Sequence, residues 1–330
     1  MTSKTINSSK SIATIALVIS LWIANDPSTA GEIAISQTDG KAVVTIDGEL
    51  FTEYIFEGHA KPILYPIIGP QGIEMTRNYP MKEDVDNEAR DHPHHKSLWF
   101  THDDVNGVRF WMEYPRSETE EKPGAIVQQD MQIVGNHIKT KNNWVAPDGQ
   151  VVCSDTRDVA FGTTAVGRFI DLNITIHACH GDVVFGDTKE GTMGIRTHPL
   201  LRITSNEQHG NHTAKGSAIN SEGVEGKEMW GKRAKWVDYW APINGNTVGI
   251  AILDHPSNPR HPTWWHARDY GLVAANPFGI HNFEGKPEGT GDMTIKSDES
   301  ITFCYRFLFH NGDAQQANIA GEFERFSANN

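Results

Sequence analysis

Two segments of the chain alternate between apolar and polar residues at every second position. In 170–178, aliphatic side chains alternate with Asp171, Asn173 and other polar residues, and 301–309 alternates in the same way around Thr302 and Arg306. Successive side chains of a β-strand point to opposite faces, so a period of two indicates a strand with one buried face. This feature favours a fold built from sheets.

Short turns join further apolar runs. Asp47-Gly48 and Asp148-Gly149 each lie between two such runs, which is typical of a tight β-hairpin. Additional strands are predicted at 63–68, 98–100, 126–134, 183–185, 200–203, 236–240 and 248–253. Many short strands with turns rich in Gly and Pro predict an all-β fold, a two-sheet antiparallel β-sandwich, of which the large galactose-mutarotase-like sandwich is one form.

A short helix is predicted at the C-terminus. Ile319, Phe323 and Phe326 fall on one helical face, and Asp313 precedes them as a candidate cap. We find no linker that divides the chain, so we expect one β-sandwich domain over 31–330.

The first 30 residues resemble a secretory signal peptide. Lys4 and Lys10 precede an apolar run at 12–24, and the small residues Ser28 and Ala30 follow it. We expect cleavage near Ala30 and a periplasmic or secreted protein. Stable membrane insertion is not expected, because a spanning helix needs roughly 20 apolar residues. A membrane anchor and a buried N-terminal helix are the alternatives.

The chain is acidic, with 29 Lys and Arg against 42 Asp and Glu and a net charge of −13. Nucleic-acid binding draws on clustered basic residues, so this balance argues against nucleic acid as a partner. A small-molecule or oligosaccharide substrate remains compatible with it. Cys153, Cys179 and Cys304 allow at most one internal disulfide, and we interpret them as structural thiols.

Charged, aromatic and imidazole side chains concentrate in two segments, 91–102 and 254–271. Both lie where predicted strands meet loops, which is where a sheet presents side chains to a ligand. An Asp-His-Pro triplet occurs in each segment and on its own indicates a turn. The density of His, Arg and Trp in both segments favours a site instead. We expect residues near 95 and near 265 to line one hollow at one end of the β-layers.

Histidines suit acid–base chemistry, because an imidazole has a pKa of about 6.5. The predicted catalytic residues are His94, His95, His261, His266 and Asp269. Asp91 is a second candidate to orient an imidazole, and burial of a carboxyl group would fit it for the acid role.

Sugar recognition is a second chemistry that fits these segments. An indole plane stacks on the apolar face of a pyranose, while Arg, Asp, Asn and His form hydrogen bonds with its hydroxyl groups. The predicted substrate-binding residues are Trp99, Arg196, Arg260, Trp265, Arg268 and Asn276.

A metal site is the third interpretation. His92, His94 and His95 are candidate ligands of zinc or another divalent metal ion. Their spacing matches none of the strong zinc patterns. No cofactor is therefore assigned with certainty from the sequence, and a divalent metal remains an alternative.

Several sequence motifs together resemble one family. The motifs are 62–66, 69–70, 91–100, 105–107, 110–111 and above all 230–279, with its Asp-His-Pro, Arg-His-Pro, Trp-His, Arg-Asp-Tyr-Gly and Ala-Ala-Asn-Pro-Phe-Gly sequences. They resemble the PmoA-like secreted bacterial proteins, labelled "methane oxygenase PmoA", whose function is unsettled. The resemblance implies an origin in bacteria that are rich in polysaccharide-degrading genes. A membrane methane monooxygenase is not expected, because the sequence has no spanning segments beyond its leader.

These observations favour a secreted or periplasmic carbohydrate-active enzyme, of hydrolase or lyase type, that acts on a glycan or modified sugar by His/Asp acid–base chemistry. The alternatives are a non-catalytic glycan-binding module and a His-ligated metalloprotein.

Overall fold

The computed structural model describes residues 1–330 except 3–30, 84, 86–87, 116, 206–213 and 329–330. The predicted signal peptide therefore lies outside the described residues. No helix in the described part of the chain has the length and apolarity that crossing a membrane requires.

Eight antiparallel strands form the first sheet, in the order β1-β2-β3-β4-β5-β11-β16-β15. Their bounds are Ile33–Thr38 (β1), Lys41–Ile46 (β2), Glu49–Ile55 (β3), Ile63–Ile67 (β4), Leu98–His102 (β5), Gly191–Arg196 (β11), Leu272–Asn276 (β16) and Trp264–Ala267 (β15). The order places the strands that flank the two His-rich segments beside one another.

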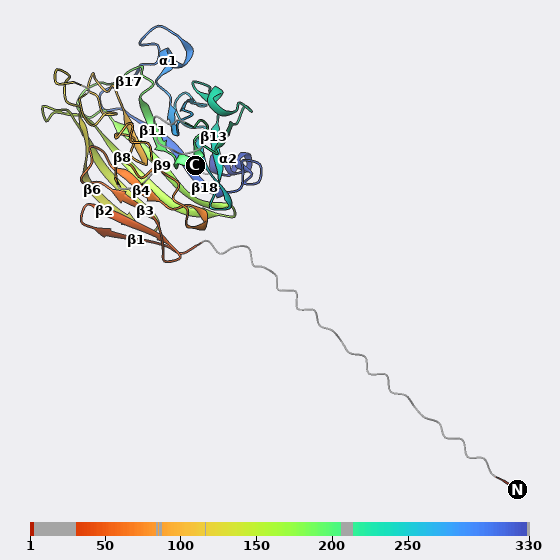
Figure 1. The fold of residues 1–330 in the computed structure, drawn as a ribbon. Coiled ribbons are helices and arrows are strands. Elements are labelled where there is room, and N and C mark those ends of the chain that lie inside the picture. The colour runs from red at the N-terminus through yellow and green to blue at the C-terminus, as the bar shows by residue number, and fades with distance from the viewer. Residues whose placement is uncertain (3–30, 84, 86–87, 116, 206–213, 329–330) are drawn as a thin grey trace.

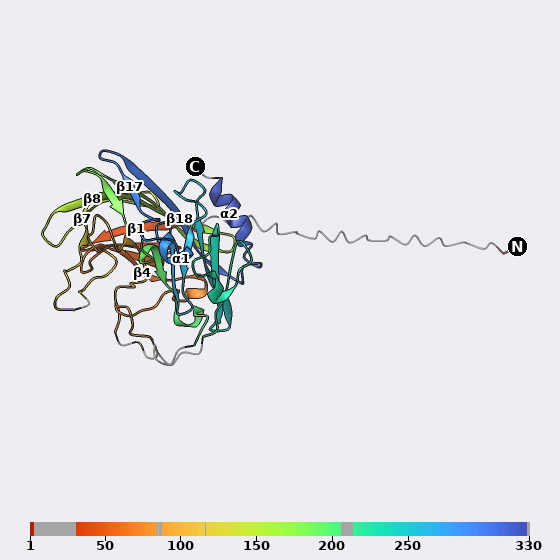
Figure 2. The same ribbon diagram turned by 90° about the horizontal axis from the view of Figure 1, so that it is seen from above.

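Eight antiparallel strands also form the second sheet, in the order β12-β13-β14-β18-β9-β8-β7-β6 (Figures 1 and 2). Their bounds are Ser217–Asn220 (β12), Trp236–Ile243 (β13), Asn246–Asp254 (β14), Ser300–Asn311 (β18), Gly167–His177 (β9), Val151–Thr164 (β8), His137–Val145 (β7) and Ala125–Val134 (β6). A separate pair joins β10 (Val183–Phe185) and β17 (Met293–Ile295).

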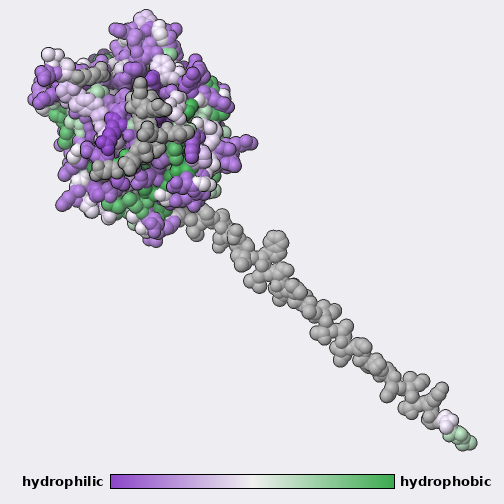
Figure 3. All heavy atoms as spheres, viewed as in Figure 1, coloured by the Kyte–Doolittle hydropathy of each residue, from purple (hydrophilic) through white to green (hydrophobic). Residues whose placement is uncertain are grey.

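The core lies between the two sheets and confirms the predicted all-β sandwich. Leu172 and Ile174 in β9 are buried and pair with Tyr305 and Phe303 in β18. These residues share one apolar cluster with residues of the first sheet such as Phe100. Hydrophilic residues cover most of the face shown in Figure 3. The apolar positions of the alternating segments therefore face the core, and the polar positions between them face away from it.

The first sheet is also covered on its outer face. In β5, Leu98 and Phe100 belong to the core between the sheets, whereas Trp99 belongs to a second apolar cluster. That cluster contains Trp111 from the loop after β5 and Leu272 from β16. Loops therefore pack against this part of the sheet and build a second layer over it.

The helices differ in part from the prediction. The C-terminal helix α2 (Ile319–Ser327) is present, but it begins six residues after the candidate cap Asp313, and Asn318 is the N-cap residue. Asp313 instead accepts hydrogen bonds from the backbone N–H groups of Gln315 and Gln316, in the turn that precedes the helix. A second helix, α1 (Ile280–Glu284), was not predicted, and 3₁₀ helices form at Pro70–Gly72, Pro199–Leu201 and Gly226–Met229.

One predicted strand is wrong. The segment 200–203 contains the end of the 3₁₀ helix Pro199–Leu201, which begins with a proline. Proline favours the first turn of a helix because it has no N–H to satisfy and a fixed φ.

Candidate functional site

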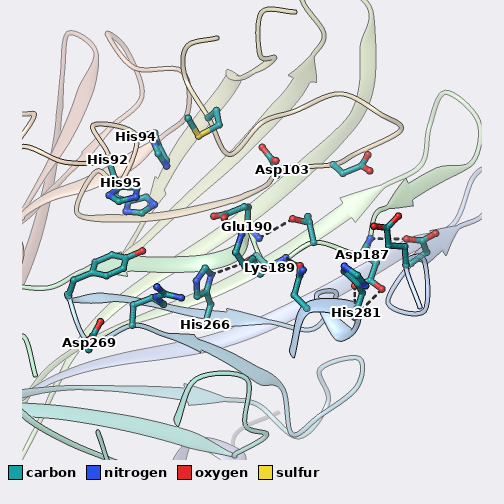
Figure 4. A pocket seen from close by; sticks show the side chains of 18 of the residues that line it. His92, His94, His95, Asp103, Asp187, Lys189, Glu190, His266, Asp269 and His281 are labelled. Carbon is teal, nitrogen blue, oxygen red and sulfur yellow. Dashed lines mark hydrogen bonds and ion pairs between the residues drawn. The ribbon is translucent and has the colours of Figure 1, made fainter. Parts of the chain in front are cut away.

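A large polar cavity of about 1310 Å³ lies against the outer layer of the first sheet (Figure 4). Six parts of the chain line it: the segment before β5, the loop after β5, the segment before β11, the residues after the 3₁₀ helix Pro199–Leu201, β15 with the turn that follows it, and α1 with the loop after it. Its lining includes His92, His94, His95, Tyr114, Asp187, Lys189, Glu190, Arg202, His266, Arg268, Asp269, Tyr270 and His281.

The order of the strands explains why the two His-rich segments meet. In the first sheet, Leu98 of β5 pairs with Ile195 of β11, and the next residue of β11, Arg196, pairs with Leu272 of β16. This register brings the segment before β5 close to the turn at 268–271. The structure thus places residues near 95 and near 265 in one hollow. The hollow lies over the outer face of the sheet, not at one end of the β-layers as the sequence suggested.

His266 is held in one tautomer. Its neighbours Trp265 and Ala267 belong to the core, and His266 lines the cavity. Its Nδ1 lies 2.7 Å from the carbonyl oxygen of Lys189. A carbonyl can only accept a hydrogen bond, so Nδ1 carries the proton and Nε2 carries the free lone pair.

His266 is also neutral at ordinary pH. Burial lowers its pKa to about 4, although the negative charge of Glu190 opposes this shift. Within the described part of the chain, no hydrogen bond reaches Nε2. Nε2 is therefore a base that can accept a proton from a molecule in the cavity.

Glu190 supplies a second proton acceptor. Burial raises the pKa of its carboxyl group, but His266 and Lys189 outweigh burial, so the pKa lies below its ordinary value. The ammonium group of Lys189 donates a 2.7 Å hydrogen bond to this carboxylate. Figure 4 shows Glu190, Lys189 and His266 between the three histidines on one side and Asp187 and His281 on the other.

His94 and His95 line the same cavity as neutral imidazoles. Burial, followed by nearby cations and histidines, lowers the pKa of His94 to about 2 and the pKa of His95 well below 6.5. His94 Nδ1 lies 3.2 Å from the Tyr114 hydroxyl. Arg196 Nη1 donates to His95 Nδ1 at 3.4 Å. At neutral pH both imidazoles are therefore uncharged, and neither carries the extra proton that an acid would donate.

The candidate metal ligands do not converge on a point. The rings of His92 and His95 are stacked, with centroids 4.8 Å apart and an interplanar angle of 3°. Stacked rings direct their nitrogen atoms sideways and not toward a shared ion. In the described residues, no group of three or more His, Cys, Asp or Glu is arranged to hold a metal ion. The predicted set of His92, His94 and His95 is therefore not a metal site in this geometry.

Asp91 holds the segment before β5 in place. Its carboxylate accepts hydrogen bonds from Arg77 at 2.6 Å and from Arg196 at 2.8 Å, and it lies 2.8 Å from His92 Nδ1. Burial raises the pKa of Asp91, but His92 and the two arginines outweigh it and hold the pKa well below its usual range. Asp91 therefore orients neighbouring groups and stays ionised.

Two predicted residues of the second segment hold loops outside the cavity. His261 Nδ1 lies 2.7 Å from the carboxylate of Asp254, and its ring stacks on Phe323 of α2. Arg260 donates hydrogen bonds to the carbonyl oxygens of Pro277 and Gly291. Both side chains hold loops and neither lines the cavity, so this geometry does not support their predicted roles in proton transfer and substrate binding.

Four other predicted residues are buried away from the cavity surface. Trp99 belongs to the outer apolar cluster, and Trp265 is fully buried, with its indole N–H donating to the carbonyl of Ala234 at 2.9 Å. Asn276 is fully buried, and Arg196 is committed to Asp91. Neither indole can stack on a sugar in the cavity, and these four residues support the site from behind.

Sequence reasoning missed part of the lining. Lys189 and Glu190 directly precede the fully buried strand β11, and their only signal is a pair of charges at the start of a run of small and apolar residues. Tyr270 stood in the second segment but was not selected, although its ring faces His92 at 5.5 Å. Asp187 belongs to a loop and His281 to helix α1, and the sequence gives no reason to place either of them there.

Together, these features define an all-β sandwich protein with a polar, histidine-lined cavity on one sheet. The chain belongs to the family described as "Family of unknown function (DUF6807)", whose model matches residues 41–324. That description does not bear on the resemblance to PmoA-like proteins, which stays a prediction. No curated protein matches the sequence.

Solved structures with low similarity include three carbohydrate-related proteins. A 4-alpha-glucanotransferase from Thermococcus litoralis is 10% identical at a TM-score of 0.30, with 84% of this chain and 39% of that chain covered. A GalM/aldose epimerase homologue from C. elegans is 8% identical at a TM-score of 0.34, covering 86% and 100%. A galactose mutarotase related enzyme from Lactobacillus acidophilus is 9% identical at 0.33, covering 84% and 97%. This chain thus spans about two fifths of the glucanotransferase.

Proposed function

We propose that this protein is an enzyme that acts on a glycan or modified sugar by acid–base chemistry in the cavity. The observation that carries the proposal is the state of His266, a neutral imidazole whose Nε2 lone pair is free in the cavity. Glu190 is an ionised carboxylate whose charge acts on the same imidazole. Two proton acceptors are thereby offered to one bound molecule.

The cavity lining supports a polar substrate. Carboxylates, histidines, arginines and an asparagine surround it, and Tyr114 and Tyr270 are its aromatic residues. Carboxylate and amide groups form hydrogen bonds with sugar hydroxyls, and tyrosine rings pack against apolar sugar faces. The tyrosines take the stacking role that the sequence assigned to Trp99 and Trp265.

In hydrolysis, His266 Nε2 or Glu190 would take a proton from a water molecule, whose oxygen forms a bond to the anomeric carbon as the glycosidic C–O bond breaks. In elimination, the same base would take a proton from a substrate carbon, whose electron pair forms a C=C bond as the C–O bond to the leaving sugar breaks. In both cases the protonated base then returns its proton to the leaving oxygen. We also propose export to the periplasm or medium, on the basis of the signal-like residues 1–30. Sequencing the N-terminus of the protein from its host tests this, and a mature chain that begins at Gly31 is expected.

The proposed activity is tested with His266→Asn. Asparagine keeps an N–H that can donate to the Lys189 carbonyl but removes the Nε2 base. In a screen against oligosaccharides with detection of products, we expect turnover by the wild type and a loss of about 10²–10⁴-fold in the variant. Binding of the sugar, measured by calorimetry, should change little.

A matched control is His137→Asn. His137 is a partly exposed histidine on β7 that pairs with Asp158 and does not line the cavity, so its loss should leave turnover unchanged. Equal turnover by His266→Asn and the wild type would contradict the proposal. Tight glycan binding with no turnover by the wild type would instead identify a glycan-binding module.

A further inference from the structure

Arg268 is a cation in the cavity without an anionic partner. Its guanidinium group lies over the ring of Tyr270, 5.3 Å from the centroid. Within the described residues, no carboxylate or carbonyl accepts a hydrogen bond from it, and it belongs to no ion pair. A guanidinium has five N–H donors in a planar fork that matches a carboxylate.

The wall behind His94 is also cationic. Lys61 and Lys96 both donate to the single carboxylate of Glu113. Lys61 is buried and also donates to the backbone carbonyl of His94 at 3.2 Å. Two lysines on one carboxylate leave an excess of positive charge close to the cavity.

A second group of cations adjoins the first. Arg77 and Arg196 are buried and share the carboxylate of Asp91. Burial and then the charge of Arg196 lower the pKa of Arg77 to about 9, while Asp91 and Glu88 oppose this. Cations from both groups also help to lower the pKa of His94. Cations therefore gather at this side of the cavity, where Glu88 and Asp269 are further carboxylates.

On the other side of the cavity, two of the carboxylates accept hydrogen bonds from the backbone. Asp187 accepts hydrogen bonds from the backbone N–H groups of His281 and Gly291. Asp292 accepts one from the backbone of Asp187 at 2.7 Å. These carboxylates hold the loops around α1 in place. The guanidinium of Arg268, in contrast, forms no ion pair with a described residue and can bind an anionic ligand.

A buried donor beside the cations also lacks an acceptor. Arg196 donates to Nδ1 of His95, so the proton of this neutral imidazole is on Nε2. Nε2 of His95 is buried without a hydrogen-bond partner, although His95 lines the cavity. A buried donor without an acceptor is costly, and an acceptor from a ligand would relieve it.

We propose that the sugar bound in this cavity is acidic and that its anionic group, the carboxylate of a uronate, binds Arg268 on the His95 side. The inference rests on the proposed function, because it names the class of sugar for the same site. The carboxylate would form a bidentate pair with the guanidinium, and the rest of the ring would extend toward His266 and Glu190. A sulfated sugar presents the same kind of charge.

The test compares four probes of equal length by calorimetry: an oligogalacturonate, its methyl ester, a sulfated oligosaccharide and a neutral oligosaccharide. We expect the wild type to bind the oligogalacturonate most tightly and to bind it more weakly at high salt. Arg268→Gln should weaken this binding about tenfold or more, in line with loss of a charge-assisted hydrogen-bonded pair, and should change binding of the ester little. Arg325→Gln on α2 is the control, because Arg325 is exposed and pairs with Glu322.

The outcomes separate the two proposals. Equal binding of the acid and its ester, or full acid binding by Arg268→Gln, would overturn the acidic substrate even if neutral sugars are turned over. Preference for the sulfated probe would assign the anionic group to a sulfate and overturn the uronate. Binding of the uronate without turnover would support the anion site and contradict the enzyme. Failure of all four probes to bind would count against both.

Discussion

His266 is kept neutral by its surroundings, and this makes its titration a test. Burial lowers its pKa to about 4, and the charge of Glu190 partly opposes the shift. A base acts only when unprotonated, so kcat/KM should stay high at neutral pH and fall as the pH drops through about 4. In Glu190→Gln the opposing charge is gone, and the pKa of His266 should fall further. NMR titration of the imidazole measures this without activity, and an unchanged or higher pKa in the variant would contradict the assignment.

At the scale of single residues, the sequence predicted part of the site. The density of imidazole and guanidinium groups identified His94, His95, His266, Arg268 and Asp269, which all line the cavity. Density could not tell which side of a strand or loop each residue occupies. His261 and Trp265 stand in the same segment as His266, yet one pairs with Asp254 and the other is in the core.

At the scale of elements, the turn between β15 and β16 presents Arg268, Asp269 and Tyr270 to the cavity. Gly271 closes this turn with a φ of +92°, and a Cβ there would lie 2.7 Å from Thr197 Oγ1. Gly271→Ala should therefore destabilise the fold by roughly 2 kcal/mol, since it combines left-handed backbone strain with a steric clash. Urea unfolding measures the change.

Gly285→Ala is the matched control for this turn. Gly285 has a φ of +64° at the C-cap of α1, and no atom lies within 4 Å of its added Cβ. It carries the same type of backbone strain without the clash, so we expect a cost of about 1 kcal/mol. Equal stability losses in the two variants would show that the contact with Thr197 has no effect.

Alternation made strands predictable where one face meets solvent. The alternation in β9 and β18 identified both. β11, β15 and β16 are buried at every position, and their sequences show no alternation. A strand buried on both faces cannot be recognised by a period of two. The site depends on these strands, which explains why its position on the outer face of the sheet was not foreseen.

At the scale of the whole molecule, buried histidines make stability depend on pH. The pKa values of His94, His95, His102 and His266 are all lowered in the folded protein, chiefly by burial. Below about pH 6.5 the unfolded chain binds protons at these residues and the folded protein does not, so the free energy of unfolding should fall as the pH is lowered. Each histidine contributes roughly 1 kcal/mol per pH unit between about 6.5 and its folded pKa.

His310 acts in the opposite direction. Burial lowers its pKa, but Asp238 outweighs burial and raises it above 6.5. The stability that this pair contributes is therefore present below pH 6.5 and is lost as the pH rises through the folded pKa.

Urea unfolding of the wild type and His266→Asn from pH 5 to 8 isolates the contribution of His266 to this pH dependence. Below pH 6.5 the variant should lose less stability per pH unit, because it lacks one histidine whose pKa is lowered in the folded protein. Identical slopes would mean that His266 titrates in the folded protein as it does in the unfolded chain, and its role as a neutral base in the cavity would then fail.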